Sequence, residues 1–326
     1  MSPGSTPPPP RVAVVTDSTA ALPDGLAHAV GLQVVPLDVT IDGARYVEGV
    51  DVTPEQLLHA LERGAKVTTS QPPPSAFAAA YERAAAAGAH EIVSVHLSGE
   101  MSGTVRSART AATVSPVPVR VVDSRTAALG LGFAALAAAH HARTPVDDAP
   151  DVPAEPEDGL GGAVRRWMTR TVHRGGPVPV WPDATEVARV AGAAAASSRV
   201  WFLVDSLEHL RRGGRLGTAA AALGTVLGLR PILSVQDGRL AVCEKVRTRR
   251  AARDRLEQLA VAELTGRPSA RIAVHHVGPS DAADEVAAHL ASAVGIATAD
   301  VLVADAGAVL AAHVGPGLLA VVVADA

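Results

Sequence analysis

The stretch at residues 92–113, which reads IVSVHLSGEMSGTVRSARTAAT, decides the class of fold. Its first part, residues 92–97, is a mainly aliphatic run with the length of a buried strand. A turn rich in glycine and hydroxyl side chains follows at residues 98–104, and a helical pattern continues over residues 105–113. A strand that leads through a polar turn directly into a helix is typical of the βαβ unit, so this stretch predicts a parallel sheet.

The same order of strand and polar turn recurs along the first half of the chain. Residues 12–15 are followed by Thr16-Asp17-Ser18, residues 32–39 form a second candidate strand, and residues 119–122 lead into a serine-containing turn. These repeats predict an α/β fold with a parallel sheet in the N-terminal half.

Helices between these strands have clear signals at their ends. Thr53 is a predicted N-cap, Pro54 occupies the first helical position, and Gln56 completes a capping box. Another helix is expected at residues 75–88, where the final glycine acts as the stop signal.

The regular pattern breaks over residues 144–182. The segment TPVDDAPDVPAEPEDGLGG is rich in Pro, Asp and Glu and can bury little apolar surface, so we predict a flexible insert here. Residues 1–10 are expected to form a disordered tail. We divide the rest into an N-terminal α/β domain at residues 11–195, which carries the insert, and a C-terminal α/β domain at residues 196–326.

The second half predicts a mixed α/β domain. Asp237-Gly238 lies between strand-like runs at residues 232–235 and 240–246, and this dipeptide is a strong signal for a two-residue hairpin turn. Further helices are expected at residues 184–197, 249–264 and 281–294, further strands at residues 200–204 and 272–277, and three β-like stretches at the end of the chain.

Composition excludes several classes of function. Apolar residues make up 48% of the chain and aromatic residues only 2%, so Ala, Val and Leu must wall any ligand pocket. The formal net charge of −4 gives no general attraction to nucleic acid or to anionic lipid headgroups. Cys243 is the single cysteine, which rules out an intrachain disulfide and a cysteine-based metal cluster. The histidines show no metal-binding spacing, so we expect no metal.

The N-terminal residues MSPGSTPPPPR contain no apolar signal core, and no later apolar run reaches transmembrane length. We therefore expect a cytoplasmic protein.

Two loops offer groups that suit an anionic ligand. TTSQP at residues 68–72 places three hydroxyls and an amide before a proline-rich helix entry, and the SGEMSGT turn adds Ser98, Ser102 and Thr104. Hydroxyls and free backbone N–H groups at a helix N-terminus form a natural anion site. The alternative interpretation is an ordinary N-capping turn for TTSQP and an ordinary βα turn for SGEMSGT.

Two further motifs place a charged or titratable side chain beside glycines. GGRLG at residues 213–217 follows a predicted helix at residues 207–212, and its paired glycines indicate a left-handed exit that aims Arg215 inward. HVGPG at residues 313–317 lies in an apolar region, and its fixed bend holds the ring of His313 in place. A surface arginine and a hydrogen-bonded core histidine are the alternatives.

Motifs of common enzyme classes do not occur in the sequence. We find neither a G-x-S-x-G elbow nor a Walker A sequence. Gly130-Leu131-Gly132 with Ala135 imitates a dinucleotide-binding motif, but it lies inside a helical pattern and well after its strand, so we assign it to helix packing.

Taken in order, the motifs resemble those of the DegV family of bacterial fatty-acid-binding proteins. The segments that carry the resemblance are VVTDSTAALP, TTSQP, SGEMSGT, VVDSRTAALGLG, FLVDSLEHLRRGGRLG, RPILSVQDGRLAVCEKVRT and AHVGPG, and they span the chain from Arg11 to its C-terminus. The resemblance implies a Rossmann-like N-terminal domain with a parallel sheet, a mixed α/β C-terminal domain, and a ligand tunnel between them.

The resemblance also implies which residues hold the carboxylate of the bound lipid. By motif match these are Thr69, with Ser70 beside it, and a serine of the second loop. Ser102 matches the family's LSGT serine, and Ser98 is the other candidate.

Four more residues match other parts of the family pattern. Arg215 and His313 match the arginine and histidine of the polar network behind the carboxylate. Lys245 and Arg247 match a K-x-R segment that faces a partner kinase.

The function implied by the resemblance is that of a non-catalytic carrier. It binds one long-chain fatty acid as its ligand, needs no other cofactor, and presents the acid to the catalytic subunit of a fatty acid kinase for acyl-phosphate formation. An acyltransferase is a further partner, membrane contact is transient, and no nucleic acid is bound. Two alternatives stay open: a hydrolase or phosphotransferase that uses Ser102 as nucleophile and His313 as base, and a lipid-dependent regulatory protein.

Overall fold

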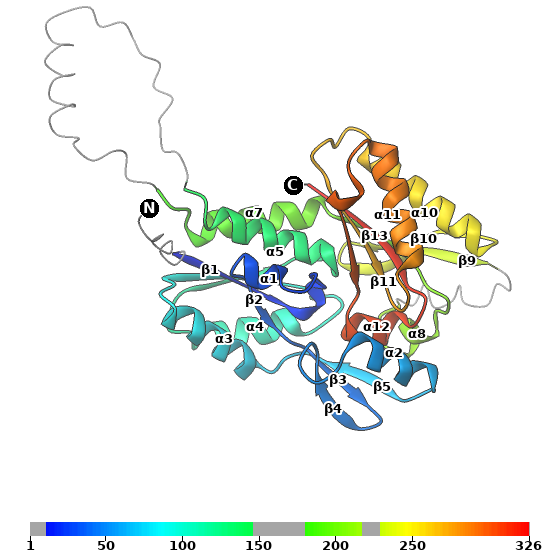
Figure 1. Ribbon diagram of the computed structural model, residues 1–326. Coiled ribbons are helices and arrows are strands. Elements are labelled where there is room, and N and C mark those ends of the chain that lie inside the picture. The colour runs from blue at the N-terminus through cyan, green and yellow to red at the C-terminus, as the bar shows by residue number, and fades with distance from the viewer. Residues whose placement is uncertain (1–10, 146–179, 217–228, 326) are drawn as a thin grey trace, which may run out of the picture.

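The computed structural model describes residues 11–145, 180–216 and 229–325 (Figure 1). The predicted tail at residues 1–10 and most of the predicted insert at residues 144–182 lie outside the described residues. The division into two domains at residues 195 and 196 stays a prediction, and the two parts are called the N-terminal half and the C-terminal half below.

The N-terminal half is built on a parallel sheet with the strand order β2-β1-β6-β7. Helices α5 and α7 cover one face of this sheet, and helices α3 and α4 cover the other. Its strands are β1 (Val12–Asp17), β2 (Gln33–Val35), β6 (Glu91–His96) and β7 (Val119–Asp123). Its helices are η1 (Ser18–Ala20), α1 (Leu26–Ala29), α2 (Pro54–Glu62), α3 (Pro74–Ala86), α4 (Thr104–Ala112), α5 (Leu129–His141) and α7 (Ala184–Ser197). This arrangement confirms the predicted α/β fold of this half.

A small antiparallel sheet with the order β4-β3-β5 lies at the lower edge of Figure 1, and the sequence did not predict it. Its strands are β3 (Asp38–Ile41), β4 (Ala44–Val47) and β5 (Val67–Ser70). The single strand expected at residues 32–39 is wrong, because the chain forms β2 and β3 in different sheets. Pro36 lies between them and has no N–H to donate to a sheet.

The small sheet also changes the setting of the TTSQP motif. Thr69 and Ser70 belong to strand β5, whereas helix α3 starts only at Pro74. The predicted proline-rich helix entry does follow the motif, at Pro73 and Pro74, but strand β5 and not the helix N-terminus fixes the hydroxyls of Thr69 and Ser70.

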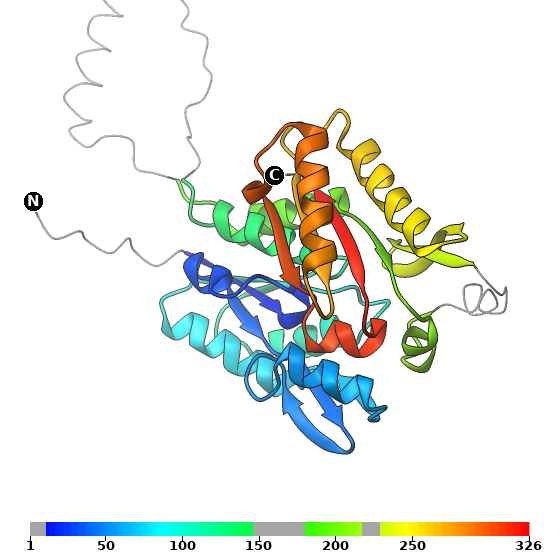
Figure 2. The ribbon, with the colours of Figure 1, turned by 45° about the vertical axis from the view of Figure 1, so that its right-hand side comes forward.

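The C-terminal half contains a mixed sheet with the strand order β10-β9-β8-β13-β11-β12. This sheet and its helices confirm the predicted mixed α/β character of this half. Strands β11 and β12 run parallel, and the other neighbours run antiparallel. Helices α10 and α11 cover the outer face (Figure 2), and the inner face meets the N-terminal half. The strands are β8 (Arg199–Leu203), β9 (Arg230–Gln236), β10 (Arg239–Val246), β11 (Arg271–His276), β12 (Val301–Asp305) and β13 (Leu319–Ala324). The helices are α8 (Glu208–Arg212), α10 (Arg249–Leu264), α11 (Asp281–Val294), η2 (Thr298–Asp300) and α12 (Ala308–Val314).

Local signals in the sequence are confirmed where they were strong. Thr53 and Gln56 form the predicted capping box of α2. Asp237 and Gly238 both have positive φ, at 50° and 79°, as the two-residue turn between β9 and β10 requires.

The end of the chain differs from the prediction. Of the three β-like stretches expected there, the middle one is helix α12, which has the sequence AVLAAHV and lies between Gly307 and Gly315. A short apolar run cannot be assigned to a strand or a helix by its periodicity alone, and alanine has the highest helix propensity of all residues.

The two halves share apolar contacts along the inner face of the C-terminal sheet. In one cluster, Phe202 and Ala320 pack with Leu37 of the N-terminal half and with helix α12. In the other, Val200 and its neighbours on the sheet pack with Leu129 of α5. These clusters frame the site described next.

Candidate functional site

An open-mouthed cavity lies between the N-terminal half and the inner face of the C-terminal sheet. Its wall is mostly aliphatic and includes Leu37, Phe202, Val235, Val309 and Ala320. Small-molecule sites typically have a mainly apolar lining with a few polar groups that converge on the ligand, and this cavity has that composition.

Polar side chains from distant parts of the sequence also line this cavity. Thr69, Ser70, Ser102, Arg215 and His313 are among its lining residues. The structure thus brings five of the six predicted carboxylate-binding residues to one cavity. That these residues bind a ligand stays a prediction.

Thr69 and His313 form the link between the two halves at this site. Thr69 Oγ1 lies 2.8 Å from His313 Nε2, although 244 residues separate them in the sequence. The other ring nitrogen, Nδ1, is buried and has no hydrogen-bond partner among the described residues. A proton on Nδ1 would be a buried donor without an acceptor, which costs ~1–3 kcal/mol. We therefore assign the proton to Nε2, which donates to Thr69, so the Thr69 hydroxyl keeps its own hydrogen for another acceptor.

The charge state of His313 agrees with this assignment. Burial, together with the smaller effect of the nearby positive charge of Arg215, lowers the pKa of His313 from 6.5 to about 4. The imidazole is therefore neutral near pH 7, and the cationic group of this cluster is Arg215.

Arg215 is held by the turn that the sequence predicted. Gly214 has a φ of 68°, which confirms the left-handed exit from α8. The Nε of Arg215 donates to the carbonyl of Met101 at 3.1 Å, and this bond ties the α8 exit to the SGEMSGT loop. Gly213 packs against His313, because a Cβ there would lie less than 3.0 Å from Nδ1 of the ring.

Ser102 stands at the start of helix α4. Its hydroxyl oxygen lies 2.8 Å from Thr104 Oγ1 and accepts from the Thr104 N–H at 3.3 Å. Thr104 is fully buried behind it. If both groups of Thr104 donate to Ser102, the Ser102 hydroxyl points its own hydrogen into the cavity, close to the positive end of the α4 dipole.

Two predicted serines are placed differently. Ser70 is exposed at the cavity rim and donates to Asp38 Oδ2 at 3.4 Å. Ser98 is fully buried and is not among the cavity-lining residues. Its hydroxyl donates to the carbonyl of Gly238 at 2.6 Å, and the structure thus places Ser98 in a contact with the β9–β10 turn.

Three polar residues of the cavity wall were not named as site residues in the sequence analysis: Thr19, Gln71 and His275. The Nε2 of Gln71 donates to Ser107 of helix α4 at 3.1 Å, and Gly103 leaves room for the amide. Its place inside the TTSQP motif was the available signal for Gln71.

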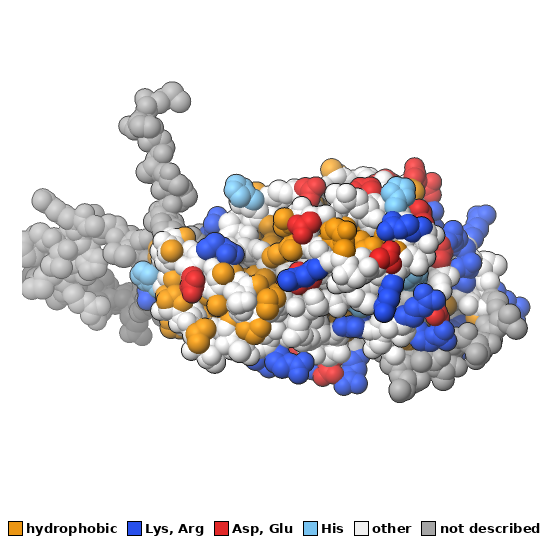
Figure 3. All heavy atoms as spheres, turned by 90° about the horizontal axis from the view of Figure 1, so that it is seen from below, with side chains coloured by type: hydrophobic (Ala, Val, Ile, Leu, Met, Phe, Trp, Pro, Cys, Tyr) orange, Lys and Arg blue, Asp and Glu red, His pale blue; other side chains and the backbone are white. Residues whose placement is uncertain are grey.

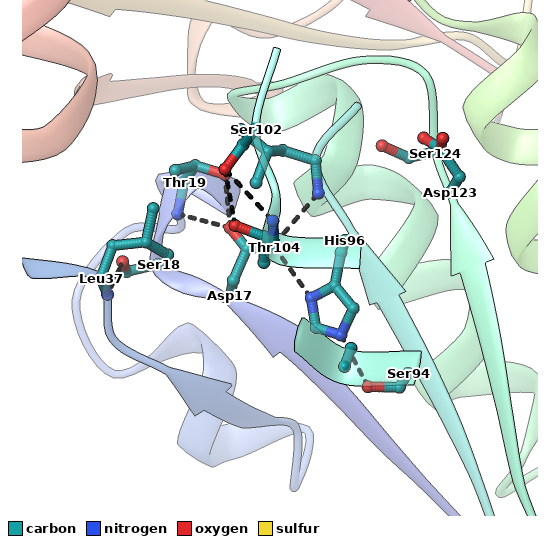
Figure 4. A network of polar contacts seen from close by, with 12 residues as sticks. Asp17, Ser18, Thr19, Leu37, Ser94, His96, Ser102, Thr104, Asp123 and Ser124 are labelled. Carbon is teal, nitrogen blue, oxygen red and sulfur yellow. Dashed lines mark hydrogen bonds and ion pairs between the residues drawn. The ribbon is translucent and has the colours of Figure 1, made fainter. Parts of the chain in front are cut away.

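A fully buried polar network lies behind Thr19 (Figure 4). Asp17 accepts from the N–H groups of Thr19 and Leu97 at 3.1 Å each, and His96 Nδ1 lies 2.9 Å from its carboxylate. His96 Nε2 lies 2.6 Å from Ser94 Oγ. The order Asp, His, Ser imitates a hydrolase triad, but all three side chains are completely buried. The network therefore joins the ends of β1 and β6 and holds Thr19 at the cavity wall.

The alternative nucleophile and base are not paired. Among the described residues, Ser102 is hydrogen-bonded to Thr104 and His313 to Thr69, and the structure shows no hydrogen bond between Ser102 and His313. The described part of the chain contains no group of three or more His, Cys, Asp or Glu side chains that could hold a metal ion. No helix in the described ranges is long and apolar enough to cross a membrane.

Lys245 and Arg247 lie away from the cavity lining. Lys245 is exposed on strand β10 opposite Pro231, and Arg247 is exposed just after this strand. The same hairpin contributes Leu240 to the cavity wall, so both cations belong to an element that reaches the site.

The fold and the cavity define the class of protein. It is an α/β protein whose two halves enclose a mainly apolar cavity, and polar side chains lie in one part of the cavity wall. A model of the DegV family, described as a family of uncharacterised proteins, matches residues 11–146 and 183–326. A DegV domain-containing protein of Streptomyces coelicolor is 41% identical over 315 residues, which cover 97% of this chain and 99% of that protein. Another from Mycobacterium tuberculosis is 37% identical over 315 residues and covers 96% of each chain. The chain belongs to the DegV family, as its motifs indicated.

Solved structures of this family have the same fold. One shows fatty acid binding by a DegV family protein from Thermus thermophilus, with a TM-score of 0.76 and 33% identity, and covers 97% of this chain and 100% of that one. DegV, a fatty acid binding protein from Bacillus subtilis, has a TM-score of 0.76 and 27% identity, with 97% and 99% of the two chains covered.

Proposed function

We propose that this protein binds one long-chain fatty acid in the cavity between its halves. The carboxylate lies at Thr69, Ser102, Arg215 and His313, and the acyl chain lies along the aliphatic wall. The observation that carries the proposal is the gathering of these side chains in one cavity whose remaining lining is mostly apolar. The fatty acid binding of the relatives from Thermus thermophilus and Bacillus subtilis supports it.

The aliphatic wall supplies the affinity for the tail. Each buried CH₂ group contributes ~0.8 kcal/mol, so a chain of ~16 carbons gains on the order of 10 kcal/mol before the cost of ordering it. The wall needs no aromatic stacking or polar recognition for this purpose, and a chain with few aromatic residues can provide it.

The carboxylate needs donors that replace its water. The hydroxyl hydrogens of Thr69 and Ser102 are free for it under the assignments made above, since His313 donates to Thr69 and Thr104 donates to Ser102. Arg215 adds a positive charge at the same site. None of these groups has to act as a nucleophile, so the site suits binding without chemistry.

We propose further that the bound acid is presented to a fatty acid kinase, which forms the acyl phosphate in trans, and that an acyltransferase then takes the acyl group. We propose that the carrier works in the cytoplasm, where the kinase has ATP, and that it contacts the membrane only transiently. Exposed Lys245 and Arg247 form part of the surface that the kinase approaches, since exposed cations favour encounter with an acidic partner. Viewed from below in Figure 3, Lys and Arg side chains gather on the side where α2 and α8 lie, and Arg215 follows α8 in the chain.

Native mass spectrometry of the purified protein tests the binding step. We expect a complex heavier than the polypeptide by the mass of one C14–C18 fatty acid, which is identified after extraction. Protein that carries no lipid and takes up none from added palmitate would refute the carrier role. Lipid that is bound but never phosphorylated by the kinase of the same genome would favour the lipid-dependent regulatory protein.

A further inference from the structure

Two helices next to the cavity, α5 and α12, begin without a side-chain cap of their own. Helix α5 follows Ala128, and helix α12 follows Gly307, and neither residue can cap a helix with its side chain. Uncapped N-terminal N–H groups in a buried position are costly, so a partner from elsewhere is required. In both cases the partner comes from the opposite half of the molecule.

Glu48 of the N-terminal half provides the acceptor for α12. Its Oε1 accepts from the N–H of Val309 at 2.7 Å, and both side chains are buried. The carboxylate packs directly over Gly307, where a Cβ would lie 2.8 Å from Oε1. The Glu48 N–H in turn donates to the carbonyl of Leu37 at 3.0 Å, which fixes the segment that carries the carboxylate.

His275 of the C-terminal half provides the acceptor for α5. The ring is completely buried on strand β11, and its Nε2 accepts from the N–H of Leu129 at 3.0 Å. Nδ1 lies 3.1 Å from the carbonyl of Ala304, so Nδ1 carries the proton and Nε2 is left as the acceptor. Ala128, the residue before the capped position, has a φ of 55°, which few non-glycine residues adopt and which the cap helps to hold.

The two caps lie on parts of the wall that contact the lipid in the proposed function. Helix α12 contributes Val309, Leu310 and His313 to the cavity, and the turn before α5 contributes Ala127 and Ala128. Each half therefore completes a wall element of the other half. A movement that separates the halves leaves two buried N–H groups without partners.

We propose that Glu48 and His275 are positioning residues that act across the interface: Glu48 holds helix α12 at the cavity wall, and His275 holds the turn that leads into α5. We propose also that they set how long a bound lipid stays, which rests on the proposed function. Glu48 has no role in binding the carboxylate, because it is absent from the cavity lining. His275 is at the wall, but both of its ring nitrogens are engaged by the protein. The two residues act on the lipid through the helices they cap.

Variants that keep or remove the acceptor test the proposal. Glu48→Gln and His275→Gln retain an acceptor oxygen, whereas Glu48→Leu and His275→Leu remove it at similar volume. The measurement is the rate at which a bound fluorescent fatty acid dissociates into excess albumin. We expect the Leu variants to release it about fivefold faster, the factor that corresponds to the ~1 kcal/mol of a lost helix cap. The Gln variants should stay within about twofold of wild type on the same scale.

Thr248→Ala is the matched control. Thr248 caps helix α10 from within the same half, by accepting from the N–H of Ala251 at 3.1 Å. Its removal should lower stability by a similar amount and leave lipid dissociation unchanged. Equal acceleration in Thr248→Ala and the Leu variants would overturn the proposal, because general loss of stability would then explain the effect.

Hydrogen exchange of single amides gives a second readout that needs no lipid. The amides of Val309 and Leu129 should exchange faster in the Leu variant of their own cap and at the wild-type rate in the Gln variant. Unchanged protection of both amides in folded Leu variants overturns the proposed caps. If a Leu variant does not fold, Glu48→Asp and His275→Asn, which withdraw the acceptor by shortening the side chain, are measured in the same way. A wild-type protein that binds no fatty acid refutes the proposed function, while the exchange of these two amides still decides the capping claim.

Discussion

Gly213 offers a way to move His313 without removing it. Gly213 has an ordinary φ of −71°, so alanine fits its backbone, but an added Cβ would lie less than 3.0 Å from His313 Nδ1. Non-bonded heavy atoms prefer separations near ~3.5 Å, so the ring has to move by at least ~0.5 Å. A ring displaced by this amount loses the present geometry of its 2.8 Å hydrogen bond to Thr69.

The size of the effect follows from this one bond. A neutral hydrogen bond contributes ~0.5–1.5 kcal/mol, so Gly213→Ala should raise the Kd for palmitate by about 2- to 12-fold. Isothermal titration of delipidated protein measures this change. Gly295→Ala is the control, because Gly295 ends helix α11 away from the cavity lining, with a φ of 76° and open space around it. Alanine there costs ~1 kcal/mol of stability through backbone strain and should leave the Kd unchanged. An unchanged Kd in Gly213→Ala, or the same increase in both variants, would refute the role given to His313.

Three further predictions follow from the site, the partner surface and the buried histidines. Thr69→Val and Ser102→Ala each remove one donor from a buried carboxylate and should weaken palmitate binding by ~1–3 kcal/mol, measured by titration; full affinity in both would remove these loops from the site. Arg247→Ala should keep its lipid in native mass spectra but slow acyl-phosphate formation by the kinase of the same genome. Arg189→Ala, a change of an exposed residue on α7, is the control and should leave the rate of acyl-phosphate formation unchanged. Equal turnover of Arg247→Ala and wild type would remove Arg247 from the interface. Burial lowers the pKa of His275 from 6.5 in the unfolded chain to about 4 in the folded protein. Between these two pH values the unfolded chain therefore binds more protons than the folded protein. The stability that the neutral ring contributes above pH 6.5 is lost as the pH falls. Because of His275, the free energy of unfolding measured in urea titrations should fall by about 2 kcal/mol when the pH is lowered from 7 to 5. If His275→Gln shows the same pH profile as wild type, this prediction is contradicted.

The features that the sequence predicted correctly are local ones. The capping box at Thr53 and Gln56 and the turn at Asp237-Gly238 depend on residues only a few positions apart, and their backbone conformation follows from the chemistry of those side chains. Alternating strands and helices likewise predict a parallel sheet, because each unit packs on the next one in the chain.

The features that the sequence did not predict depend on contacts between distant residues. Thr69 meets His313 across 244 positions without a local signal, and only the family resemblance placed both residues at one site. Glu48 meets Val309 across 261 positions, and the sequence analysis gave no sign of this contact. The run at residues 32–39 was assigned to one strand because its apolar pattern is continuous, whereas Pro36 and the pairing of β3 with β5 divide it between two sheets. Ser98 matched a family motif as well as its neighbours did, but its hydroxyl is bound to Gly238.

A crystal structure of the protein with palmitate bound tests the central claim most directly. The account predicts one lipid in the cavity, with its carboxylate oxygens within hydrogen-bond distance of Thr69 Oγ1 and Ser102 Oγ, and its acyl chain against Phe202 and Ala320. A lipid bound with its methyl end at Thr69 and Ser102, or one bound outside this cavity, would contradict it.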